Sequence, residues 1–444
     1  MYPNLYYLLK DWFGVEWKSL MFLNTFGLMV AVSFFVAAWI MTLEMRRKEK
    51  SGLLLPREET IIVGEAPSIT ELISNFIFGF LFGYKLLGIF WNKPDDMEPQ
   101  AFIFSLQGSW VGGLLVGGLM FYLKWKEKKS QQLVHPEKRQ VRIWPHDRVG
   151  DIVILALVAG VIGAKMFDNF ENWDDFLAHP MERILSPGGL TFYGGLIVAT
   201  ITIIWFAIRK GIRVIHLADC IAPAMMIAYA VGRIGCQVSG DGDWGIYNSA
   251  YITNEKGKAV AAGAAGYQEQ INRYSDYFLH GTVYDSVAKK RVIVTDRTAS
   301  SLDAIPHAGF TAPSWLPVWM VAYAYPQNVN KDGVPISGIT DEHNKALPVP
   351  VFPTPLYETV ACLFLFLFLW AIRKRIKTAG VLSGIYLLLN GAERFAIEKI
   401  RVNNHSEFLG VRLSQAEIIS LSLMIAGILL IFWARKYQSA EAAS

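Results

Sequence analysis

Long apolar stretches, repeated along the chain and separated by polar segments, constrain this sequence more than any other feature. A helix that crosses a bilayer needs about 20 mostly apolar residues, and hydrophobic residues make up 53% of the 444 positions against 18% for charged residues. We therefore predict an all-α polytopic membrane protein with about nine transmembrane helices. The expected spans are Leu20 to Leu43, Thr70 to Trp91, Phe102 to Leu123, Asp151 to Phe167, Leu190 to Ile208, Leu217 to Cys236, Leu356 to Ile372, Val381 to Lys399 and Ser414 to Trp433.

Basic clusters follow every second span, as after the first span (Arg46, Arg47 and Lys48) and after the ninth (Arg435 and Lys436). Cytoplasmic loops of membrane proteins are enriched in Lys and Arg. The pattern therefore predicts an amino terminus outside the cell and a carboxyl terminus in the cytoplasm. The first apolar stretch lacks the basic start of a cleaved signal peptide, so we expect it to be kept as a span.

Three regions follow from this topology. Residues 1–240 form a membrane domain with spans one to six, and residues 352–444 form a second with spans seven to nine. Between them, residues 241–351 are polar and rich in Gly, Asn, Asp and Tyr, and we expect an extracytoplasmic insert. In this insert, Arg291 to Val294 predicts a short strand, whereas Lys256 to Gly266 is a Gly/Ala run without helical periodicity.

An internal repeat links the second and third spans to the fourth and fifth. Phe82-Gly83-Tyr84-Lys85 parallels Ile162-Gly163-Ala164-Lys165, and Trp110-Val111-Gly112-Gly113 parallels Phe192-Tyr193-Gly194-Gly195. We interpret residues 70–125 as a duplicated helical hairpin. The alternative is chance similarity, since Gly pairs are common where membrane helices pack.

Charged residues inside spans are costly, so each needs a partner or a function. Asn390, Arg394, Glu398 and Arg401 are spaced four, four and three residues apart and so share one face of the eighth span. Arg233 lies at the outer end of the sixth span, before a Gly-rich loop whose backbone amides could approach an anion.

These arginines have two interpretations. They hold an anionic ligand such as a phosphodiester headgroup, or they form a closed ladder of ion pairs while Arg233 reaches toward lipid headgroups. Counting Glu398 against the arginines leaves two excess cations at the outer interface, which favours the anionic ligand. Tyr193, Tyr357 and Glu358 are expected at the same depth, either as ligand contacts or as an interface tyrosine and a helix-capping carboxylate.

No group of His, Cys, Asp or Glu has metal-ligand spacing, so we expect no metal and no cofactor. The net charge of +4 is too small to indicate nucleic acid as a partner. His405 lies just beyond Arg401 and is either a candidate base or a plain loop histidine.

Together these motifs resemble the bacterial prolipoprotein diacylglyceryl transferase family. The stretch beginning Gly232-Arg233-Ile234-Gly235 and ending at Gly245 resembles that family's Gly-Arg-Ile-Gly-Asn-Phe segment, and Arg394-Phe395-Ala396-Ile397-Glu398 with Arg401 resembles its Arg-Phe-x-x-Glu-x-x-Arg. Leu356-Tyr357-Glu358 resembles its Leu-Tyr-Glu. Asp219 and Pro223 also match.

The resemblance implies an enzyme of the bacterial cytoplasmic (inner) membrane that acts in lipoprotein biosynthesis. It would move the diacylglyceryl group of phosphatidylglycerol onto the lipobox cysteine of a preprolipoprotein signal peptide, with the bilayer around it. Seven spans fit this family's plan, and the duplicated hairpin adds two. The implied catalytic residues are Arg233, Arg394, Tyr193 and Glu398; the implied substrate-binding residues are Arg233, Arg401, Gly245, Asn390, Phe26, Tyr357 and Glu358.

Several positions depart from the family pattern. Tyr193 stands where the family has a histidine, Phe26 where it has a tyrosine, and Cys236 where it has an asparagine. The family's Asn-Gly-Glu becomes Ser239-Gly240-Asp241, with an extra residue before Gly245. A lipid-binding membrane protein that kept the arginines and lost catalysis is therefore the main alternative, and the repeated hairpin raises a transporter as a third.

Overall fold

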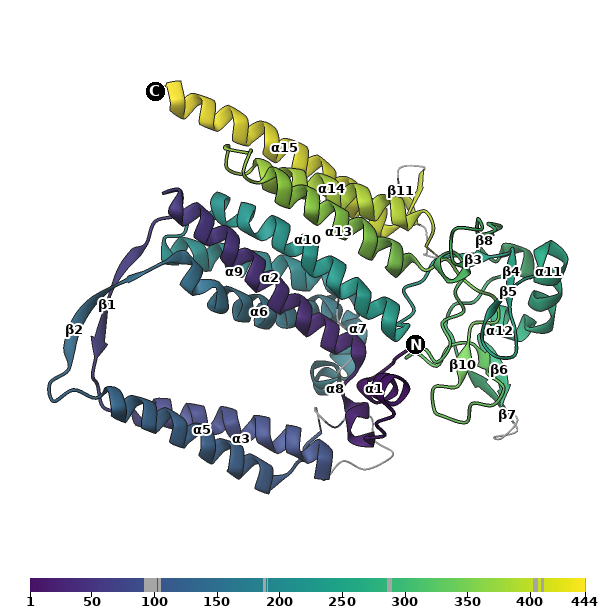
Figure 1. The fold of residues 1–444 in the computed structure, drawn as a ribbon, viewed down its shortest axis with the longest axis horizontal. Coiled ribbons are helices and arrows are strands. Elements are labelled where there is room, and N and C mark those ends of the chain that lie inside the picture. The colour runs from purple at the N-terminus through teal and green to yellow at the C-terminus, as the bar shows by residue number, and fades with distance from the viewer. Residues whose placement is uncertain are drawn as a thin grey trace. The chain divides into compact units, whose positions relative to one another are not determined.

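The computed structural model describes residues 1–91, 102, 105–186, 189, 191–285, 290–401, 406–408 and 411–443. Helices make up most of these residues (Figure 1). The contacts divide the chain into two compact units. Unit 1 comprises Met1–Met41 and Ala218–Ser444, and unit 2 comprises Thr42–Leu217. Each unit is described by itself.

Unit 2 contains two helical hairpins and one β-ribbon. The helix α2 (Thr25–Lys50) begins in unit 1 and ends in unit 2, where the antiparallel strands β1 (Arg57–Val63) and β2 (Glu137–Ile143) form the ribbon. The first hairpin consists of α3 (Ile69–Trp91) and α5 (Trp110–Gln131). The second consists of α6 (Val149–Glu171) and α9 (Phe192–Lys210), with the short helices α7 (Trp173–Ala178) and α8 (Pro180–Leu185) between them.

The two hairpins share their packing. A Cβ atom added to Gly83 of α3 would lie 2.4 Å from the carbonyl oxygen of Gly112 in α5, and one added to Gly163 of α6 would lie 2.5 Å from that of Gly194 in α9. Only glycine permits such close helix contact. Both hairpins therefore meet at a Gly-to-Gly contact at equivalent places in the sequence repeat.

A lysine holds the connecting loop in each hairpin. Lys85 Nζ donates to the carbonyl oxygens of Phe102 at 3.1 Å and Gln107 at 2.8 Å, and Lys165 Nζ donates to the carbonyl and hydroxyl oxygens of Ser186 at 3.1 and 2.9 Å. Each lysine follows its helix-contact glycine by two residues. The shared geometry supports our proposal that residues 70–125 are a copy of the second hairpin.

Unit 1 contains α1 (Leu5–Phe13), α10 (Val214–Ser239), α13 (Thr354–Ile372), α14 (Val381–Glu398) and α15 (Gln415–Ala443). Asp219 on α10 accepts hydrogen bonds from the backbone N–H groups of Gly380 and Ser383, both at 3.0 Å, at the start of α14. Free N–H groups at a helix start need such an acceptor. This contact fixes α14 against α10, whose far ends carry the charged residues of the site.

The helices α14 and α15 pack through glycines. A Cβ atom on Gly384 would lie 2.8 Å from the carbonyl oxygen of Gly427, and one on Gly391 would lie 2.7 Å from that of Ser420. Close contact along this face brings Ser414, which precedes α15, to the end of α14.

The insert, which belongs to unit 1, is built from short two-stranded sheets and two helices around buried aromatic residues that include Trp244, Tyr277 and Tyr325. The strand predicted at Arg291 to Val294 is confirmed as β7 (Lys290–Ile293), which begins and ends one residue earlier. The helix α11 (Gly263–Arg273) starts inside the Gly/Ala run Lys256 to Gly266, where the sequence shows no helical periodicity and so did not predict a helix. The other elements are β3 (Tyr247–Asn248), β4 (Tyr251–Thr253), β5 (Ala259–Ala261), α12 (Ser275–His280), β6 (Thr282–Asp285), β8 (His307–Ala308), β9 (Val334–Pro335), β10 (Lys345–Ala346), and after α14 the pair β11 (Ser406–Phe408) and β12 (Val411–Leu413).

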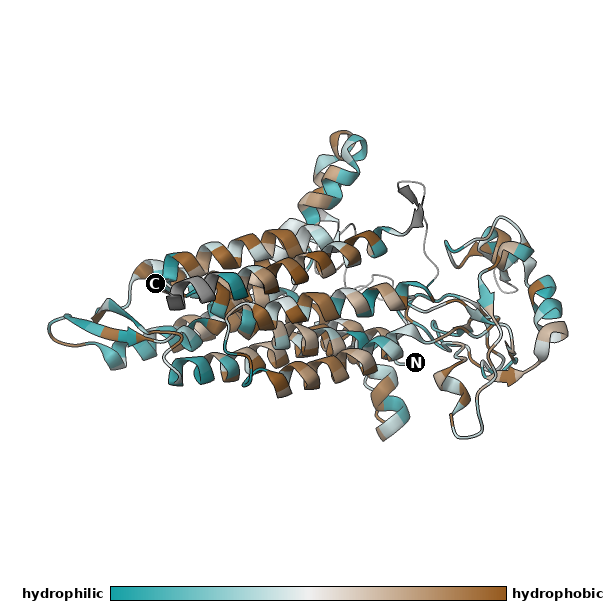
Figure 2. Cartoon of the chain, turned by 90° about the horizontal axis from the view of Figure 1, so that it is seen from above, coloured by the Kyte–Doolittle hydropathy of each residue, from teal (hydrophilic) through white to brown (hydrophobic). Residues whose placement is uncertain are grey.

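Seven helices of the described chain are long and apolar enough to cross a membrane. Figure 2 shows hydrophobic residues along these helices, whereas hydrophilic residues gather on the β1–β2 ribbon. The polytopic helical membrane fold is confirmed. The count of nine spans stays a prediction. The two expected spans that are not among the seven are α5, which ends in lysines, and α14, which carries three charges. The seven are Thr25–Lys50, Ile69–Trp91, Pro145–Glu171, Tyr193–Lys210, Val214–Ser239, Thr354–Ile372 and Gln415–Lys436.

Candidate functional site

Three helix ends and one loop of unit 1 bring the predicted charged residues together with one acid that was not predicted, Asp243. Arg233 lies near the end of α10, Glu358 lies in the second turn of α13, and Arg394 lies in the last turns of α14. Arg401 follows α14, and Asp243 lies in the loop after α10. The site is therefore built from three separate parts of the sequence, at residues 233–243, 358 and 394–401.

Glu358 is the central acceptor of this cluster, and its side chain is fully buried. Its Oε2 atom lies 2.8 Å from Arg233 Nε, and its Oε1 atom lies 2.9 Å from Arg394 Nη1 and 3.8 Å from Arg401 Nη1. The hydroxyl of Tyr229 donates to the same Oε1 at 3.2 Å. Charges placed away from water are costly unless they are paired, and Glu358 is paired here with arginines from two helices.

Asp243 joins the two outer arginines. One carboxylate oxygen pairs with Arg233 Nη1 and the other with Arg401 Nη2. Although burial acts to raise the pKa of Asp243, the two guanidinium groups lower it to about 2. Its backbone is fixed because Thr354 Oγ1 donates to the Asp243 carbonyl oxygen at 2.7 Å.

Exposure differs sharply among the three acids. The side chain of Asp243 is 34% exposed, whereas those of Glu358 and Glu398 are 0% and 1% exposed. Asp243 is therefore the one of these three acids that solvent or a ligand can reach.

Glu398 holds Arg394 from the other side. Its Oε2 atom lies 3.1 Å from Arg394 Nη2, and Ser414 Oγ donates to its Oε1 at 2.8 Å. This pair has the i, i+4 spacing expected from the sequence. Arg394 is thus fixed between Glu358 and Glu398, with its guanidinium orientation determined by both.

The expectation of two excess cations is wrong. Arg233, Arg394 and Arg401 are matched by Glu358, Glu398 and Asp243. The sequence argument counted Glu398 alone, because Glu358 and Asp243 come from distant segments.

Gly245 has no space for a side chain. An added Cβ would lie 2.7 Å from the carbonyl oxygen of Ile400 and 2.9 Å from a methyl group of Thr354. The Gly245 N–H donates to Phe352 O at 2.8 Å, and Ile246 N–H donates to Ile400 O at 2.9 Å. Gly245 therefore brings the α10 loop, the start of α13 and the end of α14 together and supports the site through its backbone.

The other predicted residues occupy varied positions. Phe26, which is 37% exposed, packs against Gly235 beside the site. The Tyr357 hydroxyl donates to the carbonyl oxygen of Met320 in the insert at 2.7 Å. Asn390 is half-buried on α14, one turn before Arg394. Tyr193 begins the apolar stretch of α9 in unit 2 and is half-buried, and His405 lies outside the described residues.

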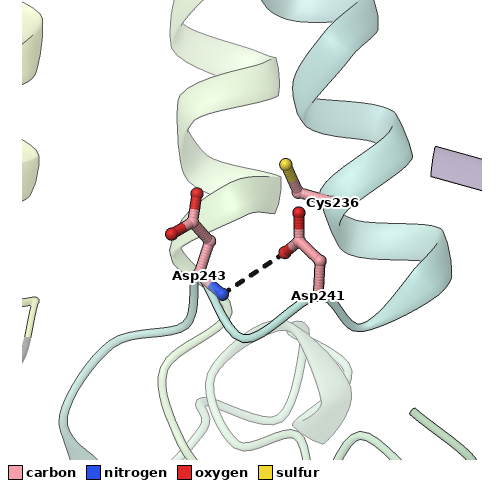
Figure 3. A group of neighbouring side chains, drawn as sticks. All are labelled: Cys236, Asp241 and Asp243. Carbon is pink, nitrogen blue, oxygen red and sulfur yellow. Dashed lines mark hydrogen bonds between the residues drawn. The ribbon is translucent and has the colours of Figure 1, made fainter. Parts of the chain in front are cut away.

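Cys236, Asp241 and Asp243 form a compact group in which one ligand atom of each lies within 4.8 Å of the others (Figure 3). The Asp243 N–H donates to Asp241 Oδ1 at 3.3 Å. Arg233 Nη1 also lies 3.6 Å from the sulfur of Cys236. Both oxygens of Asp243 face guanidinium groups, so the charges around this group oppose a metal cation.

Sequence reasoning missed Asp243, because the motif comparison placed Asp241 on the family's glutamate. The structure pairs Asp243, and not Asp241, with the arginines. Burial raises the pKa of Asp241, whose backbone carbonyl accepts from the Asn330 side chain of the insert at 2.7 Å. The extra residue before Gly245 was the one signal in the sequence that the acid pairing with the arginines is displaced from the family's glutamate position.

Comparison with known proteins points to one family. A family model described as prolipoprotein diacylglyceryl transferase matches residues 109–433. The phosphatidylglycerol--prolipoprotein diacylglyceryl transferase of Burkholderia cenocepacia (strain HI2424) is 24% identical over 309 residues, which cover 68% of this chain and 83% of that protein. The protein of the same name from Streptococcus agalactiae serotype Ia is 25% identical over 334 residues, covering 74% and 92%. The family match includes the whole charged cluster.

Proposed function

Because the chain belongs to the prolipoprotein diacylglyceryl transferase family, we propose that it transfers the diacylglyceryl group of phosphatidylglycerol to the thiol of a lipobox cysteine. The acceptor is the signal peptide of a preprolipoprotein, and the products are a thioether-linked lipid and glycerol phosphate. The lipid donor and the protein acceptor follow the names of the relatives, which cover most of this chain. The charged cluster supplies the chemistry that such a transfer needs.

One observation carries this proposal: Arg233 and Arg401 each contact one oxygen of the partly exposed Asp243 carboxylate. A phosphodiester presents two anionic oxygens in a similar fork, and arginine binds carboxylate and phosphate alike. The phosphate of the donor lipid takes the place of the Asp243 side chain, which turns toward solvent. The buried pairs of Glu358 and Glu398 stay in place and keep the arginines oriented.

The transfer requires the thiolate sulfur to bond to the glycerol carbon that bears the phosphate ester. The carbon–oxygen bond then breaks, and glycerol phosphate leaves with its electron pair and an added negative charge. Arg233 and Arg394, already oriented by Glu358, stabilise this charge as it develops. Cations near the thiol also favour the thiolate. The thiol proton leaves to a base, and Tyr193 serves as a substrate contact or proton relay.

The basic clusters orient the protein in the bacterial cytoplasmic membrane, with the amino terminus and the insert outside and the carboxyl terminus in the cytoplasm. In this orientation the ends of α10 and α14 that carry the arginines lie at the outer interface. The lipid enters laterally from the bilayer, and the lipobox cysteine arrives at the outer end of its own signal-peptide span.

Lipidation of a reporter prolipoprotein in a transferase-depleted bacterium tests the proposal. The wild-type chain restores thioether lipidation, Arg394→Ala abolishes it, and Tyr193→Phe weakens it. Arg291→Ala is the matched control, because this exposed arginine pairs with Asp276 on the insert surface and leaves lipidation unchanged. A wild-type chain that inserts into the membrane but restores no lipidation would favour the lipid-binding alternative, prompted by Tyr193, Cys236 and Phe26.

A further inference from the structure

Glu393, on α14 immediately before Arg394, is buried with 8% of its surface exposed. Its charged neighbours are Glu358 on α13, Arg233 on α10, Arg394 on α14 and Arg401 just after α14. Tyr229 of α10 and Cys362 of α13 also lie close enough to interact with it. The side chain therefore faces the charged cluster, away from the glycine contact between α14 and α15.

Among the described residues, neither carboxylate oxygen of Glu393 has a hydrogen-bond partner. Buried polar atoms in native proteins are nearly always hydrogen-bonded, and exceptions need an explanation. A carboxyl group inside a membrane span is costly unless it has a task. Since burial without a partner destabilises the fold, Glu393 is a ligand-binding candidate that the sequence comparison did not identify.

The nearby arginines are already engaged with other acids. Arg394 contacts Glu358 and Glu398, and Arg233 contacts Glu358 and Asp243. Arg401 contacts Asp243 through its Nη2. Among the described residues, each of these arginines thus already has an acid as its partner, so a ligand from outside the chain is a suitable partner for Glu393.

The two carboxylate oxygens of Glu393, which lack hydrogen-bond partners among the described residues, suit a ligand with two adjacent hydroxyl donors. The headgroup of phosphatidylglycerol is a glycerol whose two free hydroxyl groups lie one ester bond beyond the phosphate. Neutral hydroxyl donors fit this place, because the three nearby guanidinium groups are already matched by Glu358, Glu398 and Asp243. Asn390 lies three residues before Glu393, on an adjacent part of the helix face, and adds an amide within reach of the same headgroup.

We propose that Glu393 binds the headgroup hydroxyls of the donor lipid and so determines its preference for phosphatidylglycerol. This inference rests on the proposed function. It assigns the phosphate to Arg233 and Arg401 and the headgroup diol to Glu393. Glu393 then acts in substrate selection and makes no structural contact that the fold requires.

The test compares two donor lipids with the purified full-length chain in detergent and a synthetic lipobox peptide. Phosphatidylpropanol has the same phosphodiester charge and three headgroup carbons as phosphatidylglycerol but no hydroxyls. We expect wild-type kcat/KM to favour phosphatidylglycerol by roughly 10- to 100-fold, the value of two hydrogen bonds to a buried carboxyl group. In Glu393→Leu the preference falls to less than about threefold, through loss of activity on phosphatidylglycerol alone.

Thermal unfolding separates this role from a structural one. Glu393→Leu keeps or raises the melting temperature, because replacing a buried unpartnered carboxyl by a similar apolar side chain removes a desolvation cost. Asp219→Asn is the matched control: this buried acid has its hydrogen bonds satisfied within the chain. Its substitution lowers the melting temperature and leaves the lipid preference unchanged.

Several outcomes would overturn the inference. These are a wild-type chain that uses both lipids equally, a Glu393→Leu variant that keeps the preference for phosphatidylglycerol, and a Glu393→Leu variant that loses activity equally on both lipids. Any of these leaves the transferase proposal standing. A wild-type chain that is inactive on every lipid would overturn the proposed function, and the inference with it.

Discussion

Arg233 Nε lies 2.8 Å from Glu358 Oε2, which places the cation near the end of α10 against the acid in the second turn of α13. Glu358 Oε1 also lies 2.9 Å from Arg394 Nη1 on α14. One fully buried carboxylate therefore orients two arginines from two different helices. Catalysis by charge stabilisation requires this kind of preorganisation, since the groups must be in place before the transition state forms.

Glu358→Gln should be inactive and less stable. Removing one partner of a buried ion pair leaves uncompensated charge and costs about 3–5 kcal/mol. We expect lipidation to fall by roughly 100-fold or more, as when a preorganised electrostatic contact is lost, together with a lower melting temperature. Glu342→Gln is the control, because the exposed Glu342 forms an ion pair with Lys331 at the protein surface. Full activity of Glu358→Gln would show that the arginines need no buried acid.

Arg233→Lys should fail almost as completely as Arg233→Ala. The guanidinium contacts Glu358 through Nε and Asp243 through Nη1, and a single ammonium group cannot reproduce this fork. The readout is thioether lipidation of the reporter at equal membrane levels of protein. Activity of Arg233→Lys near that of wild type would indicate that positive charge alone is sufficient at this position.

Asp243→Asn should bind anionic ligands more tightly. The Asp243 carboxylate competes with phosphate for Arg233 and Arg401, so removing its charge lowers the KM for phosphatidylglycerol and the inhibition constant of glycerol phosphate. Steady-state kinetics with both compounds measure the change. If Asp243→Asn instead raises both constants, then Asp243 organises the arginines and does not occupy the phosphate position.

The same carboxylate gives a pH dependence of stability. The pKa of Asp243 falls from 3.8 to about 2 in the folded chain, so its ion pairs stabilise the fold fully above pH 3.8. That contribution is lost as the pH falls toward 2. Comparing melting temperatures at pH 5 and pH 2.5 should therefore show a smaller decrease for Asp243→Asn than for wild type. An equal decrease would show that these pairs contribute nothing to stability.

Gly245→Ala should disrupt the site although it changes no charge. A methyl group would meet Ile400 O at 2.7 Å and Thr354 Cγ2 at 2.9 Å, so the loop carrying Asp243 must move. We expect loss of lipidation and a lower melting temperature. Gly232→Ala is the matched control, because nothing lies within 4 Å of an added Cβ on that residue. Equal tolerance of both variants would contradict the close contact.

The resemblance predicted much of the cluster but not its arrangement. Arg233, Glu358, Arg394, Glu398 and Arg401 were identified from motifs, and they come together in unit 1. The i, i+4 pair on α14 followed directly from helical periodicity. Asp243 was missed because an extra residue shifted the loop, and the helix α11 was missed because its sequence lacks an amphipathic pattern at its start.

The sequence by itself determined that this chain is a helical membrane protein and which of its helices carry charge. Apolar length and charge spacing are local properties, which can be read along the chain. Only the tertiary structure decided how those charges are compensated. Glu358 neutralises arginines on α10 and α14, and Asp243 bridges Arg233 to Arg401, because helix packing brings these distant segments within hydrogen-bond distance. Ion pairing between distant residues depends on three-dimensional proximity, which no local pattern contains.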